Sequence, residues 1–244
     1  MINLTVLGCN GLYPTNGNNT SGYLVKTPSL TLVIDMGSGV FSALRNLVSP
    51  EEVSAIFISH LHHDHIADLG VYNYYLEFLH KNGRLKNKIK LLVKNDESAV
   101  YQLIKGLNYF EICDYNENEP TKIGGATLSF YKMKHPVLTH GVCVSEGGKI
   151  LSYTADSALC DNLKKVIQNS DLTLCHAPFL KEEAGENKPH ASAYEVVKIA
   201  KESGKKIIIS HLLPDKNNLP LFDEVKEFEG FYEFAKQGAT YTLK

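Results

Sequence analysis

Four histidines and an aspartate crowd the stretch Ser59-His60-Leu61-His62-His63-Asp64-His65. The apolar, β-branched run Val53–Ser59 leads into it, and we predict that this run is a strand buried on both faces of a sheet. The aromatic-rich segment Ile66–His80 that follows predicts a helix. The end of a central strand is where α/β folds hold ligands, because rigid elements position the loops there. The sequence therefore predicts a functional site at this histidine cluster.

The spacing within the cluster suits metal ions. His60 and His62 are two residues apart in an extended segment, so their side chains point the same way and can share one ion. Asp64 and His65, at the turn into the helix, can face a second ion. Imidazole with carboxylate suits zinc, iron or manganese, and zinc is favoured. The alternative is a surface tract that binds metal adventitiously, but such a tract has no reason to follow a buried strand.

Three further titratable residues lie just past predicted strands far along the chain. His135 follows the strand Ala126–Met133, and Asp156 follows the strand Ile150–Thr154. His211 follows the strand Lys206–Ser210. Because ligand sites collect at strand ends, we interpret these residues and the cluster as one constellation.

The rest of the chain alternates predicted strands and helices. The remaining strands are predicted at Ile2–Leu7, Tyr23–Lys26, Leu30–Ile34, Ile89–Val93, Val142–Ser145, Leu172–Cys175 and Ala239–Leu243. The remaining helices are predicted at Val40–Leu47, Glu97–Lys105, Leu159–Gln168, Ala193–Ser203 and Leu221–Lys236. Repeats, low-complexity segments and linkers are absent from the sequence, so we predict an α/β fold in a single domain, residues 1–244, with sheets at the centre and helices outside.

The composition excludes several classes of protein. Lys+Arg 25 against Asp+Glu 27 gives a net charge of −2, so no basic field favours nucleic acid or an anionic membrane. The sequence has no apolar run near the roughly 18 residues of a membrane span. The N-terminus lacks a basic segment before an apolar one, and the five scattered cysteines lack a C-x-x-C pair. We therefore expect a cytoplasmic protein with reduced thiols.

The motif H-x-H-x-D-H after a buried strand, with isolated His, Asp and His at later strand ends, resembles the metallo-β-lactamase superfamily over the whole chain. Asp35 in Leu32-Val-Ile-Asp-Met-Gly37 matches the early Asp-x-Gly element of that family. The segments Leu7-Gly-Cys-Asn-Gly11 and Thr20-Ser-Gly-Tyr23 are similar to the ribonuclease Z-like branch, which includes small phosphodiesterases. The resemblance implies an αββα four-layer sandwich, with two central mixed sheets flanked by helices.

The resemblance also implies two divalent metal ions, most simply Zn²⁺, with Mn²⁺ or Fe²⁺ as alternatives. Matched position by position, the ligands are His60, His62 and His135 for the first ion, Asp64, His65 and His211 for the second, and Asp156 as the bridge. His63 occupies the variable position of the motif and lies outside the ligand set. Asp35 is expected to hydrogen-bond a ligand histidine or a loop amide.

The activity that the resemblance implies is hydrolysis. Paired metals lower the pKa of a bridging water, so that a metal-bridging hydroxide is the nucleophile, and Asp64 can orient it. His62 stands where the family's di-iron oxygen reductases carry Glu, which argues against redox chemistry. His190 in Lys188-Pro-His190-Ala-Ser192 resembles the His-Ser-Thr element whose histidine protonates the leaving oxygen; a loop histidine without a role is the alternative.

One position departs from the branch pattern. The branch pairs its acid histidine with a Glu in a His-Glu-Ala-Thr-Phe element, and the matching segment here is Cys175-His176-Ala-Pro-Phe179. His176 therefore stands at the Glu position. Either His176 takes over the role of the Glu toward His190, or that pair is absent.

The expected substrate is small and anionic. Only 20 residues separate His135 from Asp156, which leaves room for two strands and a turn but not for a protruding tRNA-binding arm. With the net charge of −2, this argues against tRNA and a ribonuclease Z-type 3′ endonuclease. We expect a phosphodiesterase acting on a cyclic nucleotide-like diester. An acyl hydrolase of the lactonase, thioesterase or β-lactamase kind is the alternative. A metal-bearing regulatory protein is a third hypothesis, which the complete ligand set argues against.

Two other features have more than one interpretation. The aromatic residues Tyr72, Tyr74, Tyr75 and Phe78 share one predicted helix, which favours packing in the core or in a homodimer over stacking on substrate. The basic residues Lys81, Arg84, Lys86, Lys88, Lys90 and Lys94 are typical of a solvated face, but they can also attract an anionic substrate.

Overall fold

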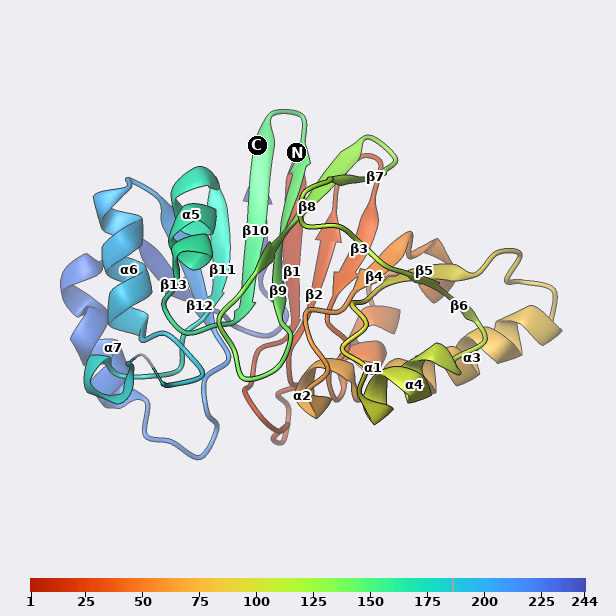
Figure 1. Cartoon of the computed structure of the whole chain (residues 1–244), viewed down its shortest axis with the longest axis horizontal. Coiled ribbons are helices and arrows are strands. Elements are labelled where there is room, and N and C mark those ends of the chain that lie inside the picture. Colours follow the sequence, from red (N-terminus) through yellow and green to blue (C-terminus); the bar gives the residue numbers. More distant parts are fainter. Residues whose placement is uncertain (186) are drawn as a thin grey trace.

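The structure, a computed structural model, describes residues 1–185 and 187–244. Two seven-stranded sheets lie at its centre (Figure 1). In order across the first sheet, the strands are β14 (Thr240–Leu243), β1 (Ile2–Gly8), β2 (Gly22–Lys26), β3 (Thr31–Ile34), β4 (Ala55–Phe57), β5 (Ile89–Leu92) and β6 (Phe110–Cys113). Across the second, they are β13 (Tyr232–Phe234), β12 (Lys206–Ser210), β11 (Leu172–His176), β10 (Lys149–Asp156), β9 (His140–Glu146), β8 (Ala126–Lys132) and β7 (Thr121–Ile123).

Both sheets are mixed. In the first, β14, β1, β2 and β3 pair antiparallel, and β3 to β6 pair parallel. In the second, β7 to β10 pair antiparallel, and β10 to β13 pair parallel. Parallel strands bring their carboxyl ends to the same edge of a sheet, so the loops after β3, β4, β10, β11 and β12 can meet at one end of the molecule.

Helices cover the outer face of each sheet, on opposite sides of Figure 1. The helices are α1 (Val40–Arg45), α2 (His63–Ile66), α3 (Leu69–Lys81), α4 (Ala99–Lys105), α5 (Asp161–Asn169), α6 (Ala193–Glu202) and α7 (Leu219–Val225). Short 3-10 turns lie at Pro50–Glu52, Lys181–Glu183 and Lys226–Phe228. α1, α3 and α4 bury Leu44, Tyr72 and Ile104 against the first sheet, and α5 to α7 bury Val197 and Leu221 among others against the second.

A third apolar layer fills the space between the sheets. Tyr23, Phe57, Phe130 and Tyr153 are among its largest fully or almost fully buried side chains. Strand β4 is buried along its whole length, as a strand covered on both faces must be. Each such large apolar side chain contributes about 1.5–3 kcal/mol when it is taken out of water. The architecture is therefore the predicted αββα sandwich.

Most predicted elements are confirmed within a few residues, but one helix is wrong. The segment predicted as the helix Leu221–Lys236 forms α7, a 3-10 turn and then strand β13. Gly230 has a φ of 94°, which ends helical geometry, and Tyr232–Phe234 then pairs with β12. Edge strands β6 and β7 were not predicted, because their half-exposed residues give little hydrophobic pattern.

The structure partly decides between the two interpretations of the aromatic residues on α3 and of the basic residues between positions 81 and 94. On α3, Tyr72 is fully buried in the core, whereas Tyr74 and Phe78 are 74% and 56% exposed. In the basic run, Lys81 pairs with Glu77 and Lys94 pairs with Asp114, which favours a solvated face. Of the helices described, none has the length and apolar character needed to cross a membrane. All five cysteines are free thiols.

Candidate dinuclear metal centre

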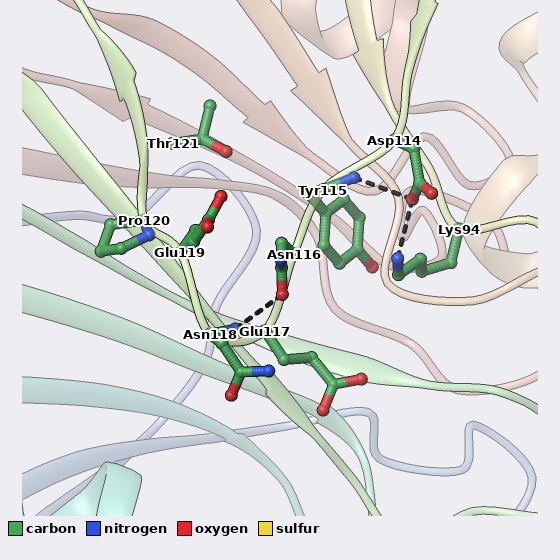
Figure 2. Close-up of a pocket in the computed structure, with 9 residues that line it drawn as sticks. All are labelled: Lys94, Asp114, Tyr115, Asn116, Glu117, Asn118, Glu119, Pro120 and Thr121. Atoms are coloured by element: carbon green, nitrogen blue, oxygen red, sulfur yellow. Dashed lines mark hydrogen bonds and ion pairs between the residues drawn. The ribbon is translucent and has the colours of Figure 1, made fainter.

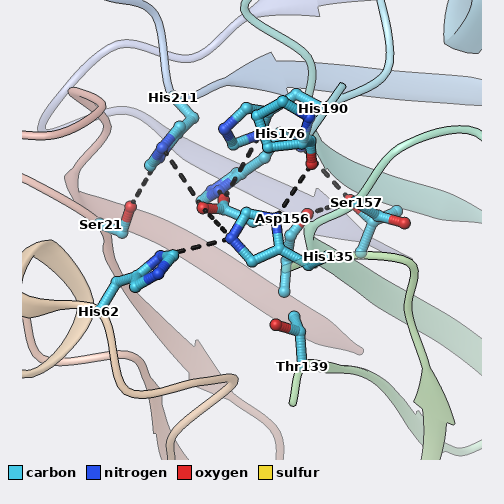
Figure 3. A network of polar contacts seen from close by, with 12 residues as sticks. Ser21, His62, His135, Thr139, Asp156, Ser157, His176, His190 and His211 are labelled. Atoms are coloured by element: carbon cyan, nitrogen blue, oxygen red, sulfur yellow. Dashed lines mark hydrogen bonds and ion pairs between the residues drawn. The ribbon is translucent and has the colours of Figure 1, made fainter. Parts of the chain in front are cut away.

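Side chains from both sheets converge on the carboxylate of Asp156 at the end of β10 (Figure 3). The Nε2 atoms of His60, His65, His135 and His211 lie 3.5, 3.6, 3.8 and 3.6 Å from Asp156 Oδ2. His62 turns its Nδ1 toward the same place, 3.0 Å from His60 Nε2 and 3.3 Å from His135 Nε2. One carboxylate oxygen is therefore common to ligand atoms from both predicted metal sites.

The arrangement fits divalent metal ions. His65 Nε2 and His211 Nε2 are buried and have no hydrogen-bond partner among the described residues. Leaving such atoms unpaired costs about 1–3 kcal/mol each, so a group that satisfies them is expected. One ligand atom each of His60, His62, His135 and Asp156 lie within 4.8 Å of one another, and so do one each of His65, Asp156, His176 and His211. Imidazole nitrogens and carboxylate oxygens crowded in this way are the donor set of zinc and similar metals.

Asp64 lies on the side of the second predicted site. Its Oδ2 is 3.6 Å from His65 Nε2 and 3.7 Å from His211 Nε2. The same oxygen accepts a hydrogen bond of 3.0 Å from the backbone N–H of Leu12. The structure thus brings all seven predicted ligands together. His63, the variable position of the motif, is exposed and lies outside them.

Asp35 fixes the orientation of the ring of one predicted metal ligand, His65. Its Oδ2 accepts hydrogen bonds from His65 Nδ1 at 2.7 Å, from Tyr153 Oη at 2.7 Å and from Ser59 Oγ at 2.8 Å. Its Oδ1 accepts the backbone N–H of Ser59 at 2.8 Å. Because His65 Nδ1 carries the proton, the Nε2 lone pair faces the cluster. The prediction that Asp35 binds a ligand histidine or a loop amide is confirmed on both counts.

The other ligand rings are held in the same way. His60 Nδ1 lies 3.0 Å from Ser59 Oγ, and His211 Nδ1 lies 3.1 Å from Ser21 Oγ. His135 Nδ1 donates to the carbonyl oxygen of Pro189 at 3.0 Å. For His60 and His135 the contact favours a proton on Nδ1 and leaves Nε2 free for a metal, because Ser59 Oγ donates its own proton to Asp35 and a carbonyl can only accept.

Backbone strain is concentrated around this centre. Among the described residues, five that are not glycine have a positive φ, and four of them flank the site: Leu12, Asp35, Ala155 and His211. Each such residue costs about 1–2 kcal/mol relative to ordinary backbone. At Gly11 the limit is space and not backbone conformation, because a Cβ there would lie 2.7 Å from the carbonyl oxygen of His211. The loops therefore give up stability to aim these side chains.

The charges of the cluster are strongly coupled. Burial alone would raise the pKa of Asp156, but His211, His65 and the hydrogen bond from His176 hold that pKa well below its usual range. Burial lowers the pKa of His211 to about 3. Burial would also lower the pKa of His65, but the carboxylates of Asp156 and Asp35 raise it well above its usual range.

The metal-free protein is expected to lose stability as the pH falls from about 7 to 5. Burial lowers the pKa values of His60, His176 and His211, so their rings stay neutral in the fold but are protonated in the unfolded chain below the ordinary histidine pKa of 6.5. Each such ring removes about 1.4 kcal/mol per pH unit. His65, whose pKa is raised, gains stability for the fold as the pH falls, but one such residue does not offset three with lowered pKa values. Thermal melts in chelator at stepped pH measure the effect, and a melting temperature that is constant or rises on acidification contradicts it.

His176 and His190 do not form the pair that the branch pattern would require. His176 is fully buried, and its two ring nitrogens contact Asp156 Oδ1 at 2.7 Å and Tyr23 Oη at 2.8 Å. His190 Nδ1 is also buried, has no hydrogen-bond partner in the part of the chain that the structure describes, and lies 4.0 Å from Asp156 Oδ1. The sequence did not reveal the contact of His176 with Asp156, because it depends on the register between the adjacent parallel strands β10 and β11.

A cavity of about 600 Å³ opens away from the centre, along the loop between β6 and β7 (Figure 2). Three of its nine lining residues are carboxylates, Asp114, Glu117 and Glu119, and Lys94 there pairs with Asp114 at 2.9 Å. His140, which had no place in the predicted ligand set, is buried behind it and pairs with Glu117 at 2.8 Å. None of the predicted metal ligands lines this cavity.

A second cavity, of about 470 Å³, begins at His190 beside the centre. Its lining residues are Lys134, Leu159, Cys160, Asp161, Lys164, Gly185, His190 and Glu195. Lys134 directly precedes the ligand His135 in the chain. This cavity therefore gives a small molecule room next to the cluster.

Known proteins share both the fold and the length of this chain. The family described as "Anti-Pycsar protein Apyc1" matches residues 2–241. The probable metallo-hydrolase YhfI of Bacillus subtilis (strain 168) is 30% identical, over 96% of this chain and 97% of YhfI. The crystal structure of YhfI, described as a metallo-β-lactamase fold protein, matches with a TM-score of 0.91 over 98% of each chain. A ribonuclease Z of Methanosarcina mazei is 21% identical, over 87% of this chain and 88% of that enzyme.

One assignment follows from the sandwich fold, from the histidines around a shared carboxylate and from these relatives. The resemblance noted in the sequence is confirmed at the level of the superfamily. The chain belongs to the Apyc1 family of metallo-β-lactamase-fold, metal-dependent hydrolases.

Proposed function

We propose that the protein is a dinuclear phosphodiesterase that hydrolyses a small anionic phosphodiester, such as a cyclic nucleotide. The observation that carries the proposal is the position of His190. Its imidazole lies 4.0 Å from the shared carboxylate of Asp156 and lines a cavity that also holds Lys134 and Lys164, with the carboxylates of Asp161 and Glu195 beside them. A proton donor for a leaving oxygen and room for an anionic molecule thus adjoin the same centre. The likeness to ribonuclease Z supports a phosphodiester as the reacting bond.

Two divalent ions held by the seven ligands would supply a nucleophilic water of lowered pKa and neutralise charge on the phosphoryl oxygens. Asp64 would orient that water and accept its proton, because the N–H of Leu12 fixes its carboxylate beside His65 and His211. As the water oxygen bonds to phosphorus, the bond from phosphorus to the leaving oxygen breaks. His190 would donate a proton to that oxygen.

The protonation of His190 depends on the substrate. Burial lowers the pKa of His190 to about 4, so the ring is neutral at neutral pH when no substrate is bound. A phosphodiester anion in the adjacent cavity would raise this pKa by charge attraction and so favour the imidazolium that donates the proton.

The short segment between His135 and Asp156 favours a small substrate over RNA. The interval between His135 and Asp156 folds as the two strands β9 and β10, joined by the glycine turn Gly147-Gly148 with φ values of 60° and 75°. A hairpin that closes this tightly provides no projecting arm in that interval. The net charge of −2 also gives no general attraction to a polyanion.

One assay of substrate class tests the proposal. Purified protein loaded with Zn²⁺ or Mn²⁺ is offered bis(p-nitrophenyl) phosphate and a panel of cyclic nucleotides, with nitrocefin and a lactone as acyl substrates. We expect turnover of the diesters. Turnover of nitrocefin or the lactone without turnover of any diester would refute a phosphodiesterase and favour the acyl hydrolase. Zinc as the bound metal, a cytoplasmic location and a homodimer stay predictions.

The lysines of the cavity are expected to contribute to substrate binding. Replacing Lys134 and Lys164 together with alanine should raise KM for an anionic diester about 3- to 10-fold and change kcat little, since partly exposed charges are each worth up to about 1 kcal/mol. Added salt should shrink the difference by screening the charges. Lys165→Ala, on the same helix but outside the lining, is the matched control. An unchanged KM in the double variant would mean that the substrate lies elsewhere.

A further inference from the structure

We propose that His176, itself held by Tyr23, is a positioning residue that fixes the Asp156 carboxylate so that one oxygen, Oδ2, serves both metal sites. The inference concerns the assembly of the metal centre and holds whichever bond the enzyme hydrolyses. Three residues carry it, and they come from three strands: Tyr23 from β2, Asp156 from β10 and His176 from β11.

The contacts form one continuous chain. His176 Nδ1 lies 2.7 Å from Asp156 Oδ1, and His176 Nε2 lies 2.8 Å from Tyr23 Oη. Tyr23 Oη in turn lies 2.8 Å from Ser210 Oγ. Tyr23 and His176 are each 0% exposed, so water cannot take over any of these bonds. Asp156 and His176 are register partners at the ends of parallel strands, which fixes their separation through the backbone.

Only one direction of proton donation satisfies the whole chain. An ionised Asp156 can only accept, so His176 must donate from Nδ1. A neutral ring with its proton on Nδ1 accepts at Nε2, and Tyr23 supplies the proton there. Tyr23 therefore selects the tautomer that grips Asp156.

The same contacts argue that His176 is not itself a metal ligand. A ligand histidine needs a ring nitrogen with a free lone pair, and both nitrogens of His176 are engaged. Its ring instead stacks on the predicted ligand His211, with centroids 4.4 Å apart and planes at 19°. Tyr153 packs against it edge-on at 5.0 Å, so the ring is clamped on two sides.

The hydrogen bond from His176 to Asp156 Oδ1 determines what the other oxygen, Oδ2, can do. With Oδ1 bound by His176, Oδ2 is the oxygen that stands 3.5–3.8 Å from four ligand nitrogens drawn from both sites. Without the donor, the carboxylate is free to rotate and to offer both oxygens to one ion. The more weakly held ion would then lose a ligand. Removing a residue that hydrogen-bonds a metal ligand typically lowers metal affinity about 10- to 100-fold.

Three variants distinguish the hydrogen-bond donor of His176 from the packing of its ring. His176→Phe keeps a buried planar ring and removes both nitrogens, whereas His176→Asn places an amide nitrogen as many bonds from Cα as Nδ1. Tyr23→Phe removes only the hydroxyl that selects the tautomer. Zn²⁺ affinity and stoichiometry are measured by competition with a chromophoric chelator, and the absorption spectrum of the Co²⁺-loaded protein reports coordination. Tyr72→Phe, which removes a buried hydroxyl bonded to the carbonyl of Pro50, is the matched control.

We expect His176→Phe to weaken the second Zn²⁺ about 10- to 100-fold and to alter the Co²⁺ spectrum, with His176→Asn recovering most of the affinity and Tyr23→Phe intermediate. Affinity and spectrum unchanged in His176→Phe would overturn the proposal. So would a loss that His176→Asn fails to recover while Tyr23→Phe binds normally, because that pattern marks a direct ligand. If His176→Phe does not fold, Tyr23→Phe decides, since normal metal binding by it overturns the proposal.

Discussion

Replacing Asp156 with alanine is expected to leave at most one tightly bound metal ion and to lower kcat/KM by at least about 10³-fold, or about 4 kcal/mol of transition-state stabilisation. The reason is geometric: Asp156 Oδ2 is the atom shared by His60 and His135 on one side and His65 and His211 on the other. Its loss also leaves crowded imidazoles without a counter-charge. Metal content by mass spectrometry and steady-state kinetics measure the two effects.

The control for Asp156→Ala is Asp223→Ala, on the exposed side of α7 and far from the centre in the fold. It should retain two ions and full activity. Retention of two ions by Asp156→Ala, at unchanged affinity, would show that Asp156 does not bridge. The expected result for Asp156→Ala does not depend on the class of substrate.

His190→Ala is expected to lower kcat for a diester with an alkyl leaving group by about 10²–10⁴-fold, while metal content stays the same. An alkoxide leaves poorly unless it is protonated, and His190 lies at the mouth of the cavity that would receive it. A p-nitrophenolate leaves without help, so the same variant should cleave bis(p-nitrophenyl) phosphate nearly as fast as the unaltered protein. The contrast between the two substrates identifies a proton donor.

A uniform loss on both substrates would instead indicate a role of His190 in binding or in local folding. Equal activity of His190→Ala and the unaltered protein on the alkyl diester would remove His190 from the mechanism. His80→Ala, an exposed histidine on α3, controls for the loss of an imidazole as such.

The sequence predicted which side chains converge because each of them lies at or just past the end of a strand, whereas their binding of metal stays a prediction. Residues 60–65 follow one buried strand, and His135, Asp156 and His211 each follow another, so strand ends alone bring them to one edge. The role of His176 could not be read in this way, since it depends on the register between β10 and β11 and on Tyr23 from the other sheet. The failed helix near the C-terminus has a similar cause, because pairing with β12 outweighs the local helical pattern at Tyr232–Phe234.

The bond from His135 Nδ1 to the carbonyl of Pro189 ties a predicted metal ligand to the residue next to His190. A carbonyl oxygen can only accept a hydrogen bond, so His135 donates from Nδ1 and, as a neutral ring, leaves Nε2 free for a metal. The bond joins two groups of the protein itself, so it holds the backbone beside His190 whether or not an ion is bound. The same bond means that a substitution at His135 would disturb both a predicted metal ligand and the segment that carries the proposed proton donor.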